Sequence, residues 1–220
     1  MTAPRHRLRL RSDVHAALVG EDLVFLDIGA DAYSCLPGAG GAVELRANGA
    51  LVVRDPSVAD QMRMAGWLGH RDAAPAARAA APRVRTTLLP HSPPPARARH
   101  AAEVLAVTVD VLRRYRGRSF AEILAAAGPA PPPPDRPPSE DLTRLVADFH
   151  GWIPYAPIPG KCLVRSFVLR RWLRRHGHDA QWVFGVATWP FRAHCWLQWG
   201  DVALDDVPER LQAFEPILVT

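Results

Sequence analysis

The chain has 220 residues, 48% of them hydrophobic, which is enough for a sizeable core in one large domain or two small ones. It contains no run of eighteen uncharged apolar residues, which argues against a membrane span, and its basic N-terminus lacks the apolar stretch of a secretory signal. The net charge of +5 comes from arginines spread along the chain among acidic residues, which argues against a nucleic-acid partner.

The three cysteines, Cys35, Cys162 and Cys195, are few and odd in number, which argues against a disulfide framework. We therefore expect a cytoplasmic protein, because the reducing cytoplasm keeps thiols free. Such a protein has room for one reactive thiol, and the surrounding sequence must indicate which cysteine provides it.

The N-terminal part of the chain predicts a small α+β module. Strands are expected over residues 7–11, 15–20, 22–28 and 31–37, because apolar runs there are separated by Gly- and Asp-containing turns. Residues 57–69 predict a short amphipathic helix with Ser57 as its N-cap. The module has no cluster of catalytic side chains, which favours a binding role.

Two proline-rich segments interrupt the pattern. Residues 73–99 predict a connection between domains, and residues 128–138 predict an exposed loop within the second domain. Helices are predicted over residues 98–118, 119–128 and 139–152, the second with a Ser119–Glu122 capping box and the third with Ser139 as its cap. A further helix from Cys162 to Gly177 and at least three strands complete the chain.

Cys162 is expected in the first turn of that last helix, directly after the helix-breaking segment "PIPG". Unpaired backbone donors and the positive end of the helix dipole stabilise a thiolate at such a position. The same free amides can form an oxyanion hole. The alternative is that Cys162 is a small buried hydrophobic residue.

A thiolate nucleophile needs an imidazole partner, and the strand "RAHCWLQW" offers His194. Side chains alternate along a strand, so Cys195 is expected to point away from His194 and to serve in packing. The alternative for His194 is a histidine that faces solvent from the strand.

A carboxylate is expected to orient the histidine, and three aspartates follow it. A two-residue turn at Gly200-Asp201 places Asp205 on the histidine face, whereas a longer loop or a bulge brings Asp206 opposite His194. Turn geometry alone leaves these two open. Asp201 lies in the turn itself, where its expected role is turn chemistry.

Other chemistries find little support. No C-x-x-C or H-x-x-x-H pair is available for zinc, so no metal site is expected. The chain also lacks a Walker loop, a G-x-G-x-x-G motif and a G-x-S-x-G motif, so no cofactor or ATP site is expected in it.

From residue 96 onward the sequence resembles the B protein of lasso-peptide biosynthesis, a transglutaminase-like cysteine peptidase. The likeness rests on "GKCLVRSFVLRRWLRRHG", the following "GV" strand, "HCW" and a final Asp, with 32 residues from Cys162 to His194 and 12 from His194 to Asp206. The resemblance implies that Cys162 is the nucleophile, that His194 is the acid–base group and that Asp206, rather than Asp205, orients it. Many members of the family have alanine where this chain has Cys195.

The N-terminal part is similar to the PqqD-like leader-recognition domain through "DLVFLDIGADAYSCLP". The resemblance implies a three-stranded, winged-helix-like module whose sheet edge takes up the leader of a precursor peptide as a further strand. The candidates for that edge are Tyr33, Ser34, Cys35 and Leu36. The expected domains are a leader-recognition module over 1–85, a linker over 86–98 and a transglutaminase/papain-like α+β peptidase domain over 99–220.

The resemblance as a whole implies a leader peptidase acting on a ribosomal lasso precursor. It also implies a partner, an asparagine-synthetase-like cyclase, which uses the ATP that this chain does not bind. Two alternatives remain from the sequence: a transglutaminase-like acyltransferase, and a scaffold that binds the leader without chemistry.

Overall fold

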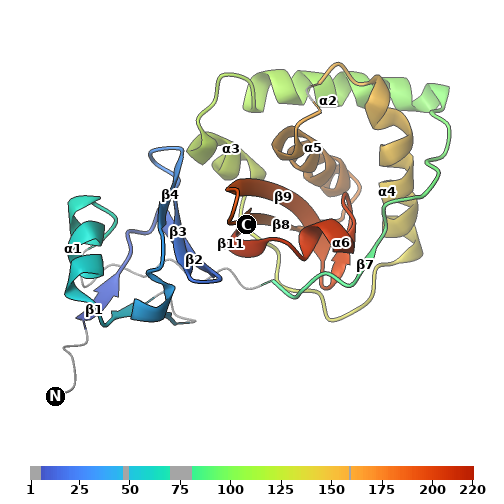
Figure 1. The fold of residues 1–220 in the computed structure, drawn as a ribbon. Helices are drawn as coiled ribbons and strands as arrows, with labels where there is room; N and C mark the ends of the chain where they lie inside the picture. Colours follow the sequence, from blue (N-terminus) through green and yellow to red (C-terminus); the bar gives the residue numbers. More distant parts are fainter. Residues whose placement is uncertain (1–5, 47–49, 70–80, 159) are drawn as a thin grey trace. The chain divides into compact units, whose positions relative to one another are not determined.

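The structure is a computed structural model that describes residues 6–46, 50–69, 81–158 and 160–220 (Figure 1). The chain divides into two compact units. The first comprises Met1–Ala80, Gly185–Ala193 and Glu215–Leu218, and the second comprises Ala81–Phe184, His194–Phe214 and Val219–Thr220. The N-terminal residues 6–69 and the C-terminal residues 81–220 are described in turn.

The N-terminal residues form two antiparallel three-stranded sheets and one α-helix. One sheet has the order β1-β6-β5 and the other the order β2-β3-β4. The elements are β1 (His6–Arg9), β2 (Val14–Val19), β3 (Asp22–Asp27), β4 (Ala32–Leu36), β5 (Val43–Leu45), β6 (Ala50–Val53) and α1 (Pro56–Met64). Their core includes Leu23, Phe25 and Met62, with Phe25 stacked on Trp67 at a ring distance of 4.1 Å.

The predicted three-stranded sheet is present as β2-β3-β4, but the second sheet differs from the expectation of a single three-stranded module. The predicted strand over 7–11 belongs to that second sheet, where β1 pairs with β6. The strands β5 and β6 have only three and four residues, so they give no alternating pattern of useful length. The helix is capped by Asp55, which accepts from the Ser57 N–H at 2.8 Å, rather than by Ser57 itself.

The C-terminal residues form an α+β fold with a five-stranded sheet of order β11-β8-β9-β10-β7. Its strands are β7 (Thr86–Thr87), β8 (Gln181–Ala187), β9 (Arg192–Trp199), β10 (Val202–Ala203) and β11 (Glu215–Val219). Its helices are α2 (Ala101–Arg114), α3 (Phe120–Ala127), α4 (Glu140–Trp152), α5 (Cys162–Arg175) and α6 (Pro208–Leu211). Helix α5 contacts α2, α3 and α4, and most of its side chains are buried (Figure 1).

The predicted helix caps are confirmed. The hydroxyl of Ser119 accepts from the Glu122 N–H while the Glu122 carboxylate accepts from the Ser119 N–H, and Ser139 accepts from the Leu142 N–H at 3.1 Å. Gly128 ends α3 with φ 74°, a conformation that favours glycine. These local signals fix where the helices around α5 begin and end.

The boundary between the parts differs from the prediction. Thr86 and Thr87, expected at the start of a linker over 86–98, form β7 and pair in parallel with β10. The Leu88 N–H donates to the Ala203 carbonyl at 2.8 Å, and the Thr87 hydroxyl donates to the Asp206 carbonyl at 2.7 Å. The second unit therefore begins at Ala81. A two-residue strand in proline-rich sequence gives no periodic signal, which is why the pattern resembled a linker.

Candidate active site

Cys162 is the first residue of α5, as the sequence predicts. Lys161 precedes it as the N-cap and makes no side-chain hydrogen bond to the first turn, so backbone N–H groups of that turn remain available. The Cys162 side chain is half-buried and its thiol is free. Helix packing therefore holds a thiol at the end where donors and the dipole favour its anion.

His194 lies near the start of β9 and is bonded to Asp206. The His194 Nε2–H donates to Asp206 Oδ2 at 2.6 Å, and the other carboxylate oxygen accepts from the Val207 N–H at 2.8 Å. Arg210 lies 3.6 Å from the same carboxylate. Because Nε2 is used in this way, the other ring nitrogen, Nδ1, is left for Cys162, and the ring lowers the pKa of that thiol. The structure thus brings Cys162, His194 and Asp206 together.

The end of the β9–β10 ladder determines which of the two aspartates, Asp205 or Asp206, lies beside His194. The turn is the two-residue one, since Trp199 pairs with Val202 and Gln198 with Ala203. After Ala203 the strand ends and the chain bends. The register that would have put Asp205 on the histidine face is therefore broken before it reaches Asp205.

Beyond the end of β10, the Asp205 carboxylate takes the place of a backbone carbonyl as the hydrogen-bond acceptor for β9. It accepts from the Leu197 N–H at 2.9 Å and from the Ser166 hydroxyl at 2.6 Å, and it is buried. Burial raises the pKa of Asp205 to about 6, because those donors and Arg165 only partly offset the lost hydration. Asp205 therefore ties α5 to β9, and Asp206 is the carboxylate that reaches His194.

Cys195 does not lie away from the site, which corrects the expectation from strand alternation. Its thiol and its backbone N–H both lie close enough to Cys162 to lower the pKa of that thiol. The Leu197 N–H and carbonyl both make hydrogen bonds on the side of β9 that faces β10. Backbone groups two residues apart in a strand point to the same side, so the N–H and carbonyl of Cys195 also point to that side, beyond the end of β10. The sulfur of Cys162 thus lies at an open strand edge, which side chains from either face can reach.

Helix α5 uses both backbone groups of Cys195. The Cys195 N–H lies beside Cys162 and lowers the pKa of its thiol, and Ser166, one helical turn later, donates to the Cys195 carbonyl at 3.4 Å. The i, i+4 spacing of Cys162 and Ser166 was visible in the sequence, but nothing there indicated which backbone groups they meet.

The three groups form a thiolate–imidazolium pair beside a carboxylate. Hydrogen bonds from Cys195 and then from His194 lower the pKa of Cys162 to about 4, against the opposing effect of burial. Burial lowers the pKa of His194, but the bonds to Asp206 and Cys162 outweigh it and raise that pKa to about 9. At neutral pH the sulfur is therefore the anion and the ring the cation.

A second buried histidine, which the sequence analysis missed, supports the same region. His150 Nε2–H donates to the Leu204 carbonyl at 3.0 Å, and Nδ1 accepts from Arg165 at 3.0 Å. Burial lowers the pKa of His150 to about 4, so the ring stays neutral and can donate through one nitrogen and accept through the other. This arrangement fixes the chain just before Asp205, and a lone helical histidine gives no sequence signal for it.

The predicted leader-binding residues lie on an edge strand. Tyr33, Ser34, Cys35 and Leu36 belong to β4, which pairs only with β3 in the β2-β3-β4 sheet, and all four side chains are partly buried. Burial raises the pKa of the Cys35 thiol, the opposite of the shift at Cys162. Within the described ranges, no group of three His, Cys, Asp or Glu side chains is arranged to hold a metal ion. No helix among the described residues is long and apolar enough to cross a membrane.

Most of the C-terminal residues match a known protein family. Residues 104–219 match the family model described as the transglutaminase-like superfamily. A stretch of 69 residues is 40% identical to the microcin J25-processing protein McjB of Escherichia coli, and it covers 31% of this chain and 31% of that protein. No solved structure matches the chain.

Proposed function

The chain belongs to the transglutaminase-like superfamily, and from that premise we propose that it is a cysteine peptidase that removes the leader from a lasso-peptide precursor. The observation that carries the proposal is the Cys162–His194–Asp206 arrangement, in which an activated sulfur, a proton donor and an orienting carboxylate lie within hydrogen-bond reach. The partial likeness to a microcin J25-processing protein supports a precursor peptide as the substrate.

In the proposed reaction the Cys162 thiolate attacks the carbonyl carbon of the bond that joins leader to core. Free N–H groups in the first turn of α5 can stabilise the resulting oxyanion. The carbon–nitrogen bond then breaks while the His194 imidazolium gives its proton to the departing core amine. The leader remains as a thioester on Cys162. His194, now neutral, takes a proton from water, which attacks the thioester and releases the leader.

Asp206 keeps this proton transfer productive. Its bond to Nε2 fixes the ring so that Nδ1 faces Cys162, and its charge stabilises the imidazolium. Hydrogen bonds and the nearby charges of His194 and Arg210 lower the pKa of Asp206 in spite of its burial, so it stays ionised.

The proposal includes a place in a pathway. The freed core amine is the group that a cyclase must join to an Asp or Glu side chain, and ATP is spent by that cyclase rather than by this chain. We place the protein in the cytoplasm beside an asparagine-synthetase-like cyclase, with the N-terminal residues capturing the leader. The β4 edge, which carries Tyr33 to Leu36, is the proposed place of capture because β4 is an outer strand of its sheet, and an extended peptide can add to such a strand.

The test is cleavage of the precursor, followed by mass spectrometry in the presence of the cyclase. The wild-type chain should yield separate leader and core, whereas Cys162→Ala should yield neither. A cross-linked product in place of two fragments would support acyl transfer to an amine. Full processing by Cys162→Ala would show that the chain is a scaffold.

A further inference from the structure

Two aromatic rings lie against the ring of His194. The Phe214 ring has its centroid 5.3 Å away, with the two planes at 39° to each other. The Trp196 ring lies at 6.1 Å with the planes at 25°, and it shares a face of β9 with His194 because side chains alternate along a strand. Phe214 comes instead from the connection between α6 and β11. The proposed reaction assigns no part to either ring.

Phe214 is held in place by the short segment that contains α6. Its N–H donates to the Leu211 carbonyl at 3.0 Å, and its side chain packs against a buried cluster that includes Leu211 and Trp196. Four residues earlier, Arg210 lies 3.6 Å from the Asp206 carboxylate. One segment therefore places a cation beside Asp206 and an aromatic ring beside His194.

An aromatic neighbour acts on the charge of His194 differently from an aliphatic one. Any apolar cover removes water and so disfavours the imidazolium, and burial does lower the pKa of His194. The face of an aromatic ring also carries negative charge, which attracts a cation within about 6 Å of the ring centroid. An aromatic side chain can therefore exclude water from the imidazolium and still favour its charge.

The charged groups around His194 leave this role to an uncharged neighbour. The Cys162 thiolate of α5 and the Asp206 carboxylate together raise the pKa of His194 to about 9, and Arg210 of α6 lies beside that carboxylate. Asp206 is bonded to Nε2, and Nδ1 is left for Cys162. Because both anions act at the ring nitrogens, the face of the ring is the part that an aromatic neighbour can stabilise.

We propose that Phe214 is a positioning residue for the acid–base group, whose ring covers the His194 imidazolium and stabilises it by a cation–π contact. The inference rests on the proposed function, in which His194 gives its proton to the departing core amine. Phe214 keeps the ring protonated until that step and restricts its rotation away from Cys162. Trp196 is less suited to a test, because it is buried and its indole N–H donates to Gln198 at 2.7 Å.

The test is a pH titration of His194 by NMR in the full-length protein with isotope-labelled histidine, the signal being assigned by its loss in His194→Gln. Phe214→Leu keeps an apolar cover but removes the aromatic face. It should lower the pKa of His194 by about half a unit to one unit. Phe214→Tyr keeps the face and should restore the wild-type value. If thermal melting shows that Phe214→Leu does not fold, Phe214→Met replaces it.

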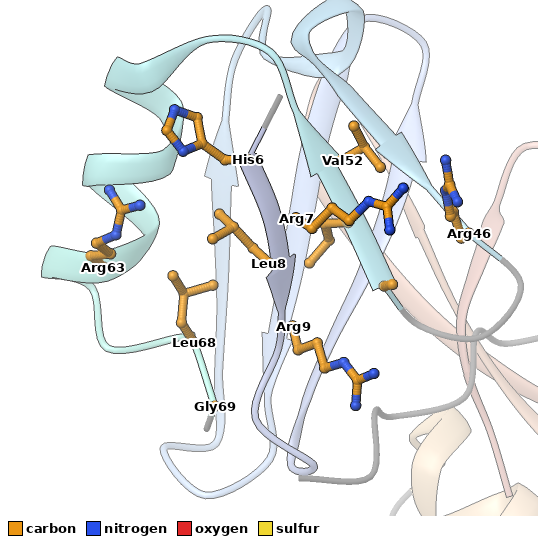
Figure 2. A pocket seen from close by; sticks show the side chains of 11 residues that line it. His6, Arg7, Leu8, Arg9, Arg46, Val52, Arg63, Leu68 and Gly69 are labelled. Carbon is orange, nitrogen blue, oxygen red and sulfur yellow. The ribbon is translucent and has the colours of Figure 1, made fainter. Parts of the chain in front are cut away.

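Two controls separate this effect from a general loosening of the core. Val219→Ala removes apolar volume from the cluster against which Phe214 packs, and it should leave the titration of His194 unchanged. His6 serves as the internal reference. It borders a cavity of about 780 Å³ whose described lining contains no Phe, Tyr, Trp, Asp or Glu (Figure 2). Its chemical shift at each pH should be the same in the wild type and in every variant.

Precursor cleavage gives the second measurement. The alkaline limb of the rate against pH should move to lower pH in Phe214→Leu by the same amount as the pKa of His194, with KM unchanged. An unchanged or raised pKa of His194 in Phe214→Leu would show that Phe214 only excludes water, and would overturn the inference. A higher KM with an unchanged pH profile would also overturn it, since Phe214 would then contact the substrate.

The two measurements also separate failure of the inference from failure of the proposed function. Normal precursor cleavage by the wild type without a shift in Phe214→Leu would defeat the inference alone. A shift in Phe214→Leu in a protein that does not cleave the precursor would defeat the proposed function and leave the contact with His194 standing.

Discussion

The Cys162–His194 pair defines the pH range over which the proposed nucleophile exists. The pKa of Cys162 is lowered to about 4, so the thiolate is lost as pH falls through that value. The pKa of His194 is raised to about 9, so its proton is lost as pH rises through that value. Alkylation of Cys162 by iodoacetamide should therefore be fast at pH 6, where an ordinary thiol with a pKa of about 8.5 is almost wholly protonated.

Replacing His194 by alanine should slow that alkylation at pH 6 by more than about tenfold, because a hydrogen bond and a positive charge are removed from the thiolate. The rate is followed by mass spectrometry of the peptide that contains Cys162, with Cys35 in the same sample as the internal reference. If Cys162 and Cys35 react alike at pH 6 in the wild type, the ion pair is absent.

Cys195 is expected to tune the nucleophile. Its thiol makes the largest contribution to the lowered pKa of Cys162. Serine is nearly the same size as cysteine and keeps a hydrogen-bond donor, so it separates the effect of the donor from the effect of packing. Cys195→Ala should raise the apparent pKa of Cys162 alkylation by about one to two units, since a hydrogen bond to a charged group contributes about 1.5–3 kcal/mol and one unit corresponds to about 1.36 kcal/mol. Cys195→Ser should restore most of the shift. Equal profiles for the two variants would show that Cys195 acts only by filling space.

The two neighbouring aspartates should separate into a chemical and a structural role. Asp206→Asn should leave the fold intact and reduce precursor cleavage by about 10³- to 10⁴-fold, because the ring loses its orienting charge. Asp205→Ala should instead destabilise the fold by about 2–4 kcal/mol, since it leaves the Leu197 N–H and the Ser166 hydroxyl without their acceptor. Urea unfolding and cleavage rates measured on both variants give the comparison, and a stable but inactive Asp205→Ala would reverse the assignment.

At the level of elements, the sequence predicts most of what local chemistry controls. The caps at Ser119 and Ser139 and the start of α5 at Cys162 all follow from residues within a few positions of one another. What escapes prediction depends on distant partners. Asp205 ends a ladder because Ser166 and Leu197 meet it in space, and β7 is a strand only because β10 lies beside it.

The segment that follows β7 is packed against α4, and one glycine makes this testable. A side chain at Gly151 would collide with the Pro94 carbonyl, so Gly151→Ala should destabilise the fold by about 1–3 kcal/mol although alanine is the better helix former. Gly41→Ala is the matched control, because a Cβ there meets nothing within 4 Å. Thermal or urea unfolding reports both. A neutral or stabilising Gly151→Ala would show that this segment is a loose linker after all.

At the scale of the whole molecule, the residues for the proposed chemistry and those for the proposed docking lie in different parts of the sequence. Cys162, His194, Cys195 and Asp206 all belong to residues 81–220, whereas the β4 edge belongs to residues 6–69. A fused chain of this kind keeps a bound peptide at high effective concentration near the group that acts on it. Weakening the docking residues should therefore lower cleavage at low precursor concentration more than at saturation.

The order of the five-stranded sheet predicts how long a C-terminal fragment must be. A fragment of residues 81–220 keeps every strand of that sheet, including β7 and its bond from Thr87 to the Asp206 carbonyl. It should fold and should alkylate at Cys162 at pH 6 as fast as the full chain does. A fragment of residues 99–220 lacks β7, which exposes the edge of β10 and frees the chain near Asp206. We expect it to melt at a lower temperature and to alkylate at pH 6 more slowly by about tenfold or more, because the carboxylate that holds His194 is no longer fixed. Equal melting and equal alkylation of the two fragments would place the boundary near residue 99 and make β7 dispensable.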